Sequence, residues 1–385
     1  MRRQSIPLRR RTYLSGLGAG ALAVLGGCAT GTGSRGTTQE FDPEAEGNRT
    51  ATPTGTTGRN RTVPTLEDVP ALSGELVIYL GRGEGGLYRD LVEHLESERY
   101  PDLSVSVRRD SSASLANTII EEEKGGSSPA DVFWSIDAGA LGAVAERGLT
   151  ASLPSDVTGL VPSQFRDPKR RWVGISGRAR AVPYNTDRFD ESDIPDDILA
   201  FPEEEAFDDA LGWAPRYGAF QAFVTAMRFV HGEQTTRRWL RGMLESGVTA
   251  YPGEFLVTNA VAEGELGAGL ANHYYALRLK EAKPDAPLEL AFTSNDAGAL
   301  VNASGVAVLA SSDRKPLAVD FIRHLLTREV QRFLAEQAYE YPLVPGIDPP
   351  GSLPPIAELD PPQFDLTRLA NVEATLRMLR TEGVL

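Results

Sequence analysis

The fold class follows from a segment near residue 80, which reads Leu76-Val77-Ile78-Tyr79-Leu80 and continues as Gly81-Arg82-Gly83-Glu84-Gly85-Gly86. The apolar run predicts a buried strand, and the glycines after it predict a loop. A helix is predicted next, because apolar residues recur there at helical spacing: Leu87, Leu91, Val92 and Leu95. Strand-like segments at 103–107 and 131–134 then alternate with helical segments at 112–124 and 138–147. Strands that alternate with helices in this way indicate an α/β lobe with a largely parallel sheet.

The chain from about Leu72 to Leu385 is too long for one ordinary core and predicts two lobes. The extended segment 178–184 leads into the second lobe, where 218–230 and 235–245 predict helices. We expect the N-lobe to comprise 71–180 and 302–345, and the C-lobe 181–301 and 346–385. A single amphipathic helix is predicted to carry Leu317, Phe321, Leu325, Phe333 and Leu334, and a last helix is predicted over 366–380.

The first 27 residues predict an export signal. A twin-arginine pattern, Arg10-Arg11-Thr12-Tyr13-Leu14, precedes a short run of small and apolar residues. Cys28 follows Leu25-Gly26-Gly27 and is the only cysteine of the chain. This position predicts lipidation and anchoring to the outer face of the cell membrane, and the alternative is a chance cysteine behind an ordinary signal.

The amino-acid composition of the chain bears on its tether, on the class of its partners and on its host. Residues 28–70 are polar and predict a disordered tether. The formal net charge of -14 argues against nucleic acid, which requires clustered basic surface. An acidic, lysine-poor, exported chain also predicts a salt-loving host.

The glycine loop allows three interpretations. It matches the dinucleotide-binding pattern, which would indicate an exported NAD-dependent enzyme, but an exported protein has no evident access to that cofactor. A glycine loop at a helix start also offers backbone N–H groups to an anion, and Arg82 beside Gly83 favours this interpretation. The third interpretation is a flexible turn.

Two adjacent tyrosines, Tyr274 and Tyr275, form the most informative polar group. The residues after them are predicted to be helical, with Asn272 as the N-cap. A junction of strand and helix can turn both phenols toward one site. Phenolate is a hard oxygen donor that suits a hard ion such as Fe³⁺, although paired tyrosines are also common packing residues.

Five segments together resemble the ferric-ion-binding family of ABC-importer substrate-binding proteins, in a lipoprotein of haloarchaeal type. The resemblance runs from about Leu76 to the C-terminus. The segments are Ser135-Ile136-Asp137-Ala138-Gly139-Ala140-Leu141, Ser176-Gly177-Arg178-Ala179-Arg180, Asn272-His273-Tyr274-Tyr275, Asp296-Ala297-Gly298-Ala299-Leu300-Val301-Asn302-Ala303-Ser304-Gly305 and Glu340-Tyr341-Pro342-Leu343-Val344-Pro345.

The resemblance implies a two-lobed periplasmic-binding (type II) clamshell that carries Fe³⁺ to a membrane permease, with Tyr274 and Tyr275 as iron ligands. Other family ligands are missing: Gly83 stands where some members have histidine, and Phe220 where others have a third tyrosine. A carboxylate such as Asp137 or Glu254 is a candidate for a further position.

The resemblance also implies a synergistic anion, carbonate or phosphate. Candidates to bind it are Arg82, Gly83, Arg178, Arg180 and Asn272, with Tyr217, Gly218 and Ala219 supplying backbone contacts. His273 is expected to orient the tyrosines rather than bind the metal. Hinges are expected near Arg180 and Val301.

No catalytic constellation is evident, so we expect a monomeric binding protein rather than an enzyme. The alternative within this fold is a small anionic or phosphate-bearing solute bound without iron.

Overall fold

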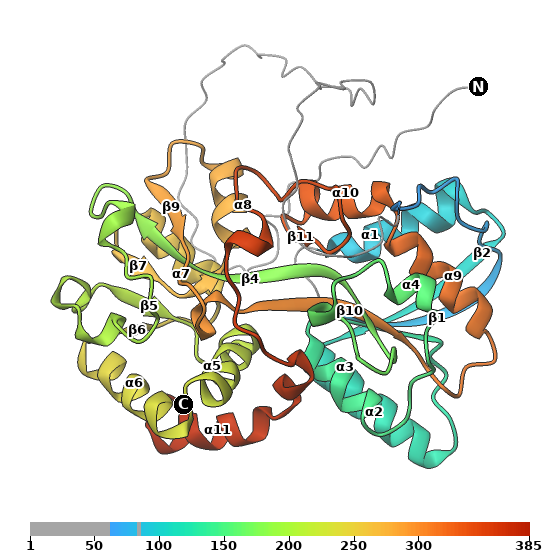
Figure 1. The fold of residues 1–385 in the computed structure, drawn as a ribbon, viewed down its shortest axis with the longest axis horizontal. Coiled ribbons are helices and arrows are strands. Elements are labelled where there is room, and N and C mark those ends of the chain that lie inside the picture. Colours follow the sequence, from blue (N-terminus) through green and yellow to red (C-terminus); the bar gives the residue numbers. More distant parts are fainter. Residues whose placement is uncertain (1–61, 83–85) are drawn as a thin grey trace, which may run out of the picture. The chain divides into compact units, whose positions relative to one another are not determined.

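The computed structural model describes residues 62–82 and 86–385, and residues 62–385 fall into one compact unit. The predicted signal, Cys28, the start of the tether and Gly83 lie outside the described residues. The predicted two-lobed α/β architecture is confirmed (Figure 1).

The N-lobe is built on the predicted parallel strands. Strand β1 (Gly74–Gly81) pairs in parallel with β2 (Leu103–Asp110) and with β3 (Val132–Ser135). Strand β10 (Val301–Val308) returns antiparallel beside β3. The helices are α1 (Leu87–His94), α2 (Ser112–Gly125), α3 (Ala138–Ala145), α9 (Lys315–Leu325) and α10 (Arg328–Gln337). Figure 1 shows α2 and α3 on one side of the strands and α1 and α10 on the other. Strands β3 and β10 and most of β1 are therefore buried, whereas the edge strand β2 is largely exposed.

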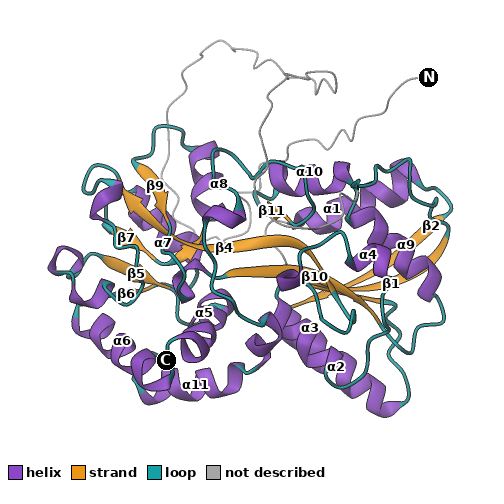
Figure 2. Ribbon diagram, in the orientation of Figure 1, coloured by secondary structure: helices purple, strands orange, loops and turns teal. Residues whose placement is uncertain are grey.

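The C-lobe continues from the long strand β4 (Val173–Asn185), which is buried along its whole length. Its strands are β5 (Leu211–Trp213), β6 (Thr249–Ala250), β7 (Ala268–Gly269), β8 (Ala271–Asn272) and β9 (Leu288–Ala291). Around them lie α5 (Gly218–Val230), α6 (Glu233–Glu245), α7 (Glu254–Ala262), α8 (Tyr274–Ala282) and α11 (Val372–Thr381) (Figure 2).

Strand β4 changes partner where the two lobes meet. Up to Ala179 it pairs with β10, from Arg180 it pairs with β8, and from Val182 with β9. Val301 opposes Ala179 at the start of β10. The expected hinge positions therefore lie where the chain passes from one lobe to the other.

The predicted single helix from residue 315 onward is wrong, because two helices, α9 and α10, occupy this region. The break falls at Leu326 and Thr327. There the Thr327 hydroxyl donates to the carbonyl of His324 at 2.7 Å, and the Gln331 side chain donates to the carbonyl of Leu325 at 2.8 Å. The Gln331 side chain thus provides a donor for one of the last carbonyls of α9, where a helix end lacks intrahelical donors.

The C-terminal segment contacts both lobes, which corrects its assignment to the C-lobe alone. The predicted last helix is divided into a short helical turn, Leu366–Ala370, and α11. The turn lies so close to α3 that a Cβ on Gly139 would be 2.8 Å from the Leu369 carbonyl carbon. Helix α11 packs on α5, where the hydroxyls of Thr225 and Thr375 are 2.7 Å apart.

The fold begins earlier than residue 71, which corrects the end of the predicted tether. Val63 and Leu66 are buried, the Leu66 amide donates to the Glu329 carboxylate at 3.0 Å, and the Arg328 amide donates to the Pro64 carbonyl at 2.9 Å. Two apolar side chains in a polar stretch thus cover the start of α10. Across residues 62–82 and 86–385, we find no helix with the length and apolar character needed to cross a membrane.

Candidate metal centre

Helix α8 begins with the two adjacent tyrosines. Both side chains are buried, and their ring centroids lie 4.6 Å apart. Successive residues of a helix project about 100° apart, so two neighbours in the first turn can face the same site. Asn272 was expected to cap this helix, but it lies in β8, and the residue before the helix is His273.

The hydroxyl of Tyr274 receives hydrogen bonds from two donors. The Asn272 side chain donates to it at 2.9 Å, and the Arg178 guanidinium donates from β4. Arg180 donates to the other end of the Asn272 amide at 3.2 Å, which fixes the nitrogen toward the phenol. Two donors at one oxygen stabilise negative charge there, as metal ligation requires.

Arg178 connects the tyrosine site to the N-lobe. Its guanidinium donates to the carbonyl of Ile136 at 2.8 Å and lies 3.9 Å from the carboxylate of Glu340. The same carboxylate accepts hydrogen bonds from Tyr88 and Ser176. Burial and the charge of Glu340 raise the pKa of Tyr88 well above its usual range, so Tyr88 is a neutral donor here. Residues of both lobes therefore meet at one arginine.

Arg180 and Glu254 form a buried ion pair, and this changes both expectations for them. One carboxylate oxygen of Glu254 accepts a hydrogen bond from the Arg180 guanidinium. The other accepts from the backbone N–H of Asn272 at 2.9 Å. Both side chains are buried. In this arrangement the charges of Glu254, a candidate for the metal, and Arg180, a candidate for the anion, neutralise each other.

Tyr217 contributes a third phenol, which the sequence interpretation missed. Its hydroxyl lies 2.7 Å from that of Tyr275, whereas only backbone contacts were expected from this residue. Phe220 is fully buried and stacks edge-on against Trp213 at 5.2 Å, so it belongs to the C-lobe core. The available signal was a tyrosine one helical turn before Phe220.

The other predicted residues lie around this group. Asp137 is partly buried and caps α3, accepting from the Ala140 amide at 2.9 Å. Burial raises the pKa of Asp137. Asp137 follows Ile136, whose carbonyl binds Arg178. Gly218 and Ala219 open α5, where the first N–H groups of a helix have no intrahelical acceptor.

Arg82 is exposed at the end of β1, and its amide donates to the carbonyl of Asp110 at 2.8 Å. A Cβ on the preceding Gly81 would lie 3.1 Å from the amide of Ile136. The base of the glycine loop thus adjoins the segment that carries Asp137.

His273 faces the backbone. Its ring nitrogens lie 3.2 Å from the Ala179 carbonyl oxygen and 2.7 Å from that of Tyr339. Burial lowers the pKa of His273 to about 4, so the ring is neutral at ordinary pH. The His273 ring lies edge-on to the Tyr274 ring, with 5.4 Å between the ring centroids.

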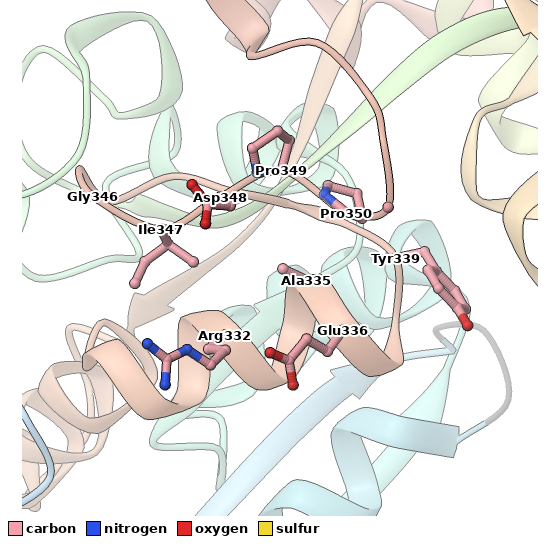
Figure 3. Close-up of a pocket in the computed structure, with 10 residues that line it drawn as sticks. Arg332, Ala335, Glu336, Tyr339, Gly346, Ile347, Asp348, Pro349 and Pro350 are labelled. Atoms are coloured by element: carbon pink, nitrogen blue, oxygen red, sulfur yellow. The ribbon is translucent and has the colours of Figure 1, made fainter. Parts of the chain in front are cut away.

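A cavity of about 320 Å³ lies between α10 and the loop 346–351. Figure 3 shows its lining, which includes Arg332, Glu336, Tyr339 and Asp348. Tyr339 also packs against the cluster that contains Tyr274 and Tyr275, and its carbonyl oxygen lies 2.7 Å from a ring nitrogen of His273. Within the described ranges, no group of three or more His, Cys, Asp or Glu side chains could hold a metal ion. The buried phenols of Tyr274 and Tyr275 are hard oxygen donors and form the candidate metal centre.

Known proteins share this sequence and fold. Residues 83–332 match the model of the bacterial extracellular solute-binding protein family. The major ferric iron-binding protein of Neisseria meningitidis serogroup B is 34% identical over 268 residues, covering 68% of this chain and 80% of the relative. The Fe(3+)-binding periplasmic protein of Serratia marcescens is 30% identical over 293 residues, covering 74% of this chain and 83% of the relative.

Among solved structures, iron-bound HitA from Pseudomonas aeruginosa is similar, with a TM-score of 0.72 and 30% identity. That match covers 80% of this chain and 99% of HitA. The chain therefore belongs to the bacterial extracellular solute-binding protein family, in the group that contains these ferric iron-binding proteins.

Proposed function

We propose that this protein captures Fe³⁺ outside the cytoplasm and delivers it to the permease of an ABC importer. The observation that carries the proposal is the pair of buried phenols at the start of α8, of which Tyr274 accepts from Arg178 and Asn272. Hard phenolate oxygens suit Fe³⁺, and the relatives named above are ferric iron-binding proteins.

Tyr274 and Tyr275 bind the ion in this proposal, and Asp137 supplies a carboxylate from the N-lobe. Carbonate or phosphate fills a remaining position, near the start of α5 at Gly218 and Ala219 and near Arg82 with Gly83. Because both phenols are buried, iron enters only when the lobes move apart, and the hinges near Arg180 and Val301 serve this motion.

The protein acts as a monomer held at the outer face of the cell membrane. The support for the anchor is the sequence around Cys28, which follows a twin-arginine signal. Replacement of Cys28 by Ser in the full-length gene is expected to release the protein from the membrane fraction of the cells into the medium. Retention of the variant in that fraction would contradict lipid anchoring.

The iron proposal is tested by visible absorbance. Metal-stripped protein is titrated with ferric citrate, alongside Tyr274→Phe and Tyr275→Phe. We expect a tyrosinate-to-iron absorption band in the parent protein and a weaker band, with weaker binding, in each variant, because each loses one phenolate ligand.

Tyr251→Phe is the matched control, since Tyr251 lies in the same lobe and is partly buried against the packing cluster around α7. It is expected to keep the full band. A parent protein that shows neither the band nor thermal stabilisation by ferric citrate would overturn the proposal.

A further inference from the structure

A buried carboxylate, Glu340, lies at the corner between α10 and β11 (Tyr341–Pro342). Strand β11 pairs antiparallel with β4, so that Tyr341 lies opposite Gly177. The same register carried back by one residue places Glu340 beside Arg178. Glu340 is 3% exposed, so its negative charge requires a partner inside the protein.

Two hydroxyl groups fix the orientation of this carboxylate. One oxygen of Glu340 accepts hydrogen bonds from Tyr88 and Ser176, each at 2.5 Å. The ring of Tyr88 is stacked on Trp134 with 4.7 Å between the ring centroids, so the phenol that donates to Glu340 is itself held in place. The other carboxylate oxygen therefore faces Arg178, at 3.9 Å from its Nε atom.

Arg178 brings a positive charge to the proposed iron site. Its guanidinium donates to the hydroxyl of Tyr274 and to the carbonyl of Ile136, and its central carbon lies 5.2 Å from the centroid of the Tyr274 ring. Arg178 is 5% exposed, so water screens its charge little. An uncompensated guanidinium at this place would repel Fe³⁺, and the carboxylate of Glu340 offsets that repulsion.

We infer that Glu340 is a positioning residue of the iron site that acts through Arg178. It compensates the charge of Arg178 and keeps the guanidinium directed at Tyr274, so that the arginine can donate a hydrogen bond to the phenolate without opposing the ion. This inference rests on the proposed iron capture at Tyr274 and Tyr275.

The test replaces Glu340 by Gln, which keeps an oxygen for Tyr88 and Ser176 but removes the charge. Iron affinity is measured by competition with nitrilotriacetate, and loss of a partner behind a metal ligand typically weakens binding about 10–100-fold. We expect a decrease in this range. At saturating iron, the tyrosinate-to-iron band should move to shorter wavelength, because the uncompensated charge of Arg178 holds electrons more tightly on the Tyr274 oxygen.

Glu122→Gln is the matched control, because Glu122 has partners of the same three kinds. It accepts from Tyr79 at 2.8 Å and from Ser128 at 2.6 Å, and it pairs with Arg108 at 3.0 Å. Tyr79 and Arg108 belong to β1 and β2, which β3 and β10 separate from β4. The control should keep the iron affinity and the band of the parent, and an equal change in both variants would overturn the inference.

A second pair of variants tests whether Glu340 acts through Arg178, and it stays informative if circular dichroism shows that Glu340→Gln alone is unfolded. Arg178→Gln and the double variant Arg178→Gln, Glu340→Gln should bind iron within about threefold of each other and show the same band position. A further loss of about tenfold or more in the double variant would mean that Glu340 acts without Arg178 and would overturn the inference.

The remaining outcomes separate this inference from the proposed function. If the parent binds iron with a tyrosinate band and Glu340→Gln reproduces its affinity and its band position, Glu340 has no positioning role, and iron capture by the tyrosine pair stands. A parent that binds no iron would overturn the proposed function and this inference with it.

Discussion

Glu254 illustrates how one buried carboxylate can help to orient a side chain of the candidate metal centre. It neutralises Arg180 and accepts from the amide of Asn272, while Arg180 fixes the Asn272 side chain that donates to Tyr274. Removal of one partner from a buried ion pair leaves an uncompensated charge, which typically costs about 3–5 kcal/mol. Glu254→Gln is therefore expected to lower the free energy of unfolding by about 3 kcal/mol, measured by urea denaturation.

An exposed ion pair provides the control. Lys283 and Glu263 also form a salt bridge, but both side chains are close to half exposed. Such pairs contribute about 0–1 kcal/mol, so Glu263→Gln should change stability by less than 1 kcal/mol. The double variant Arg180→Gln, Glu254→Gln should be more stable to urea than Glu254→Gln alone, because it leaves no unpaired buried charge. Equal stability of the two variants would contradict a specific interaction between Arg180 and Glu254.

At the scale of elements, the packing of the C-terminal turn on α3 depends on glycine. A Cβ on Gly139 would lie 2.8 Å from the Leu369 carbonyl carbon and 2.9 Å from the Ala370 nitrogen, both backbone atoms that cannot simply rotate away. Overpacking of this kind typically costs about 1–3 kcal/mol. We therefore expect Gly139→Ala to lower the thermal unfolding midpoint clearly.

The matched substitution is Gly125→Ala at the end of α2, where a new Cβ would meet nothing within 4 Å. It should leave stability unchanged or raise it slightly, because alanine restricts the unfolded chain. Equal effects of the two substitutions would show that the contact with the turn is unimportant.

The same elements show how far sequence reasoning reaches. Hydrophobic spacing was sufficient to predict β1, β2 and the helices around them, and the paired tyrosines were sufficient to indicate a candidate metal centre. Spacing did not reveal the break at Thr327, because apolar residues continue at helical spacing across it. The pairing of Arg180 with Glu254, 74 residues apart, depends on tertiary contacts that no local pattern encodes.

At the scale of the whole molecule, buried histidines link stability to pH. His324 is buried, and its ring contacts the carbonyl of Asp320 and the hydroxyl of Tyr100. Burial lowers the pKa of His324 below the ordinary value of 6.5. The unfolded chain thus binds this proton more readily than the folded one, so its contribution to stability is complete above about pH 6.5 and declines as the pH falls toward the folded pKa.

The expected result is that the free energy of unfolding decreases on acidification from pH 7, and that His324→Gln shows a shallower decrease over this range. His231→Gln serves as the comparison. His231 accepts from the Ala297 amide, so this variant checks for general effects of replacing a hydrogen-bonded histidine. If the free energy of unfolding depends on pH in the same way in the parent and in His324→Gln, His324 is not the source of the pH dependence.

The C-terminal turn has a mechanical consequence. Two strands, β4 and β10, pass between the lobes side by side, and a pair of adjacent strands can bend like a strip and also twist about its length. The turn that packs against α3, followed by α11 on α5, adds a third connection away from that strip. Because the third connection lies away from the two strands, the three together oppose twisting of one lobe against the other and leave bending as the easier motion. We therefore expect the lobes to close in the same relative orientation each time a ligand is bound and released.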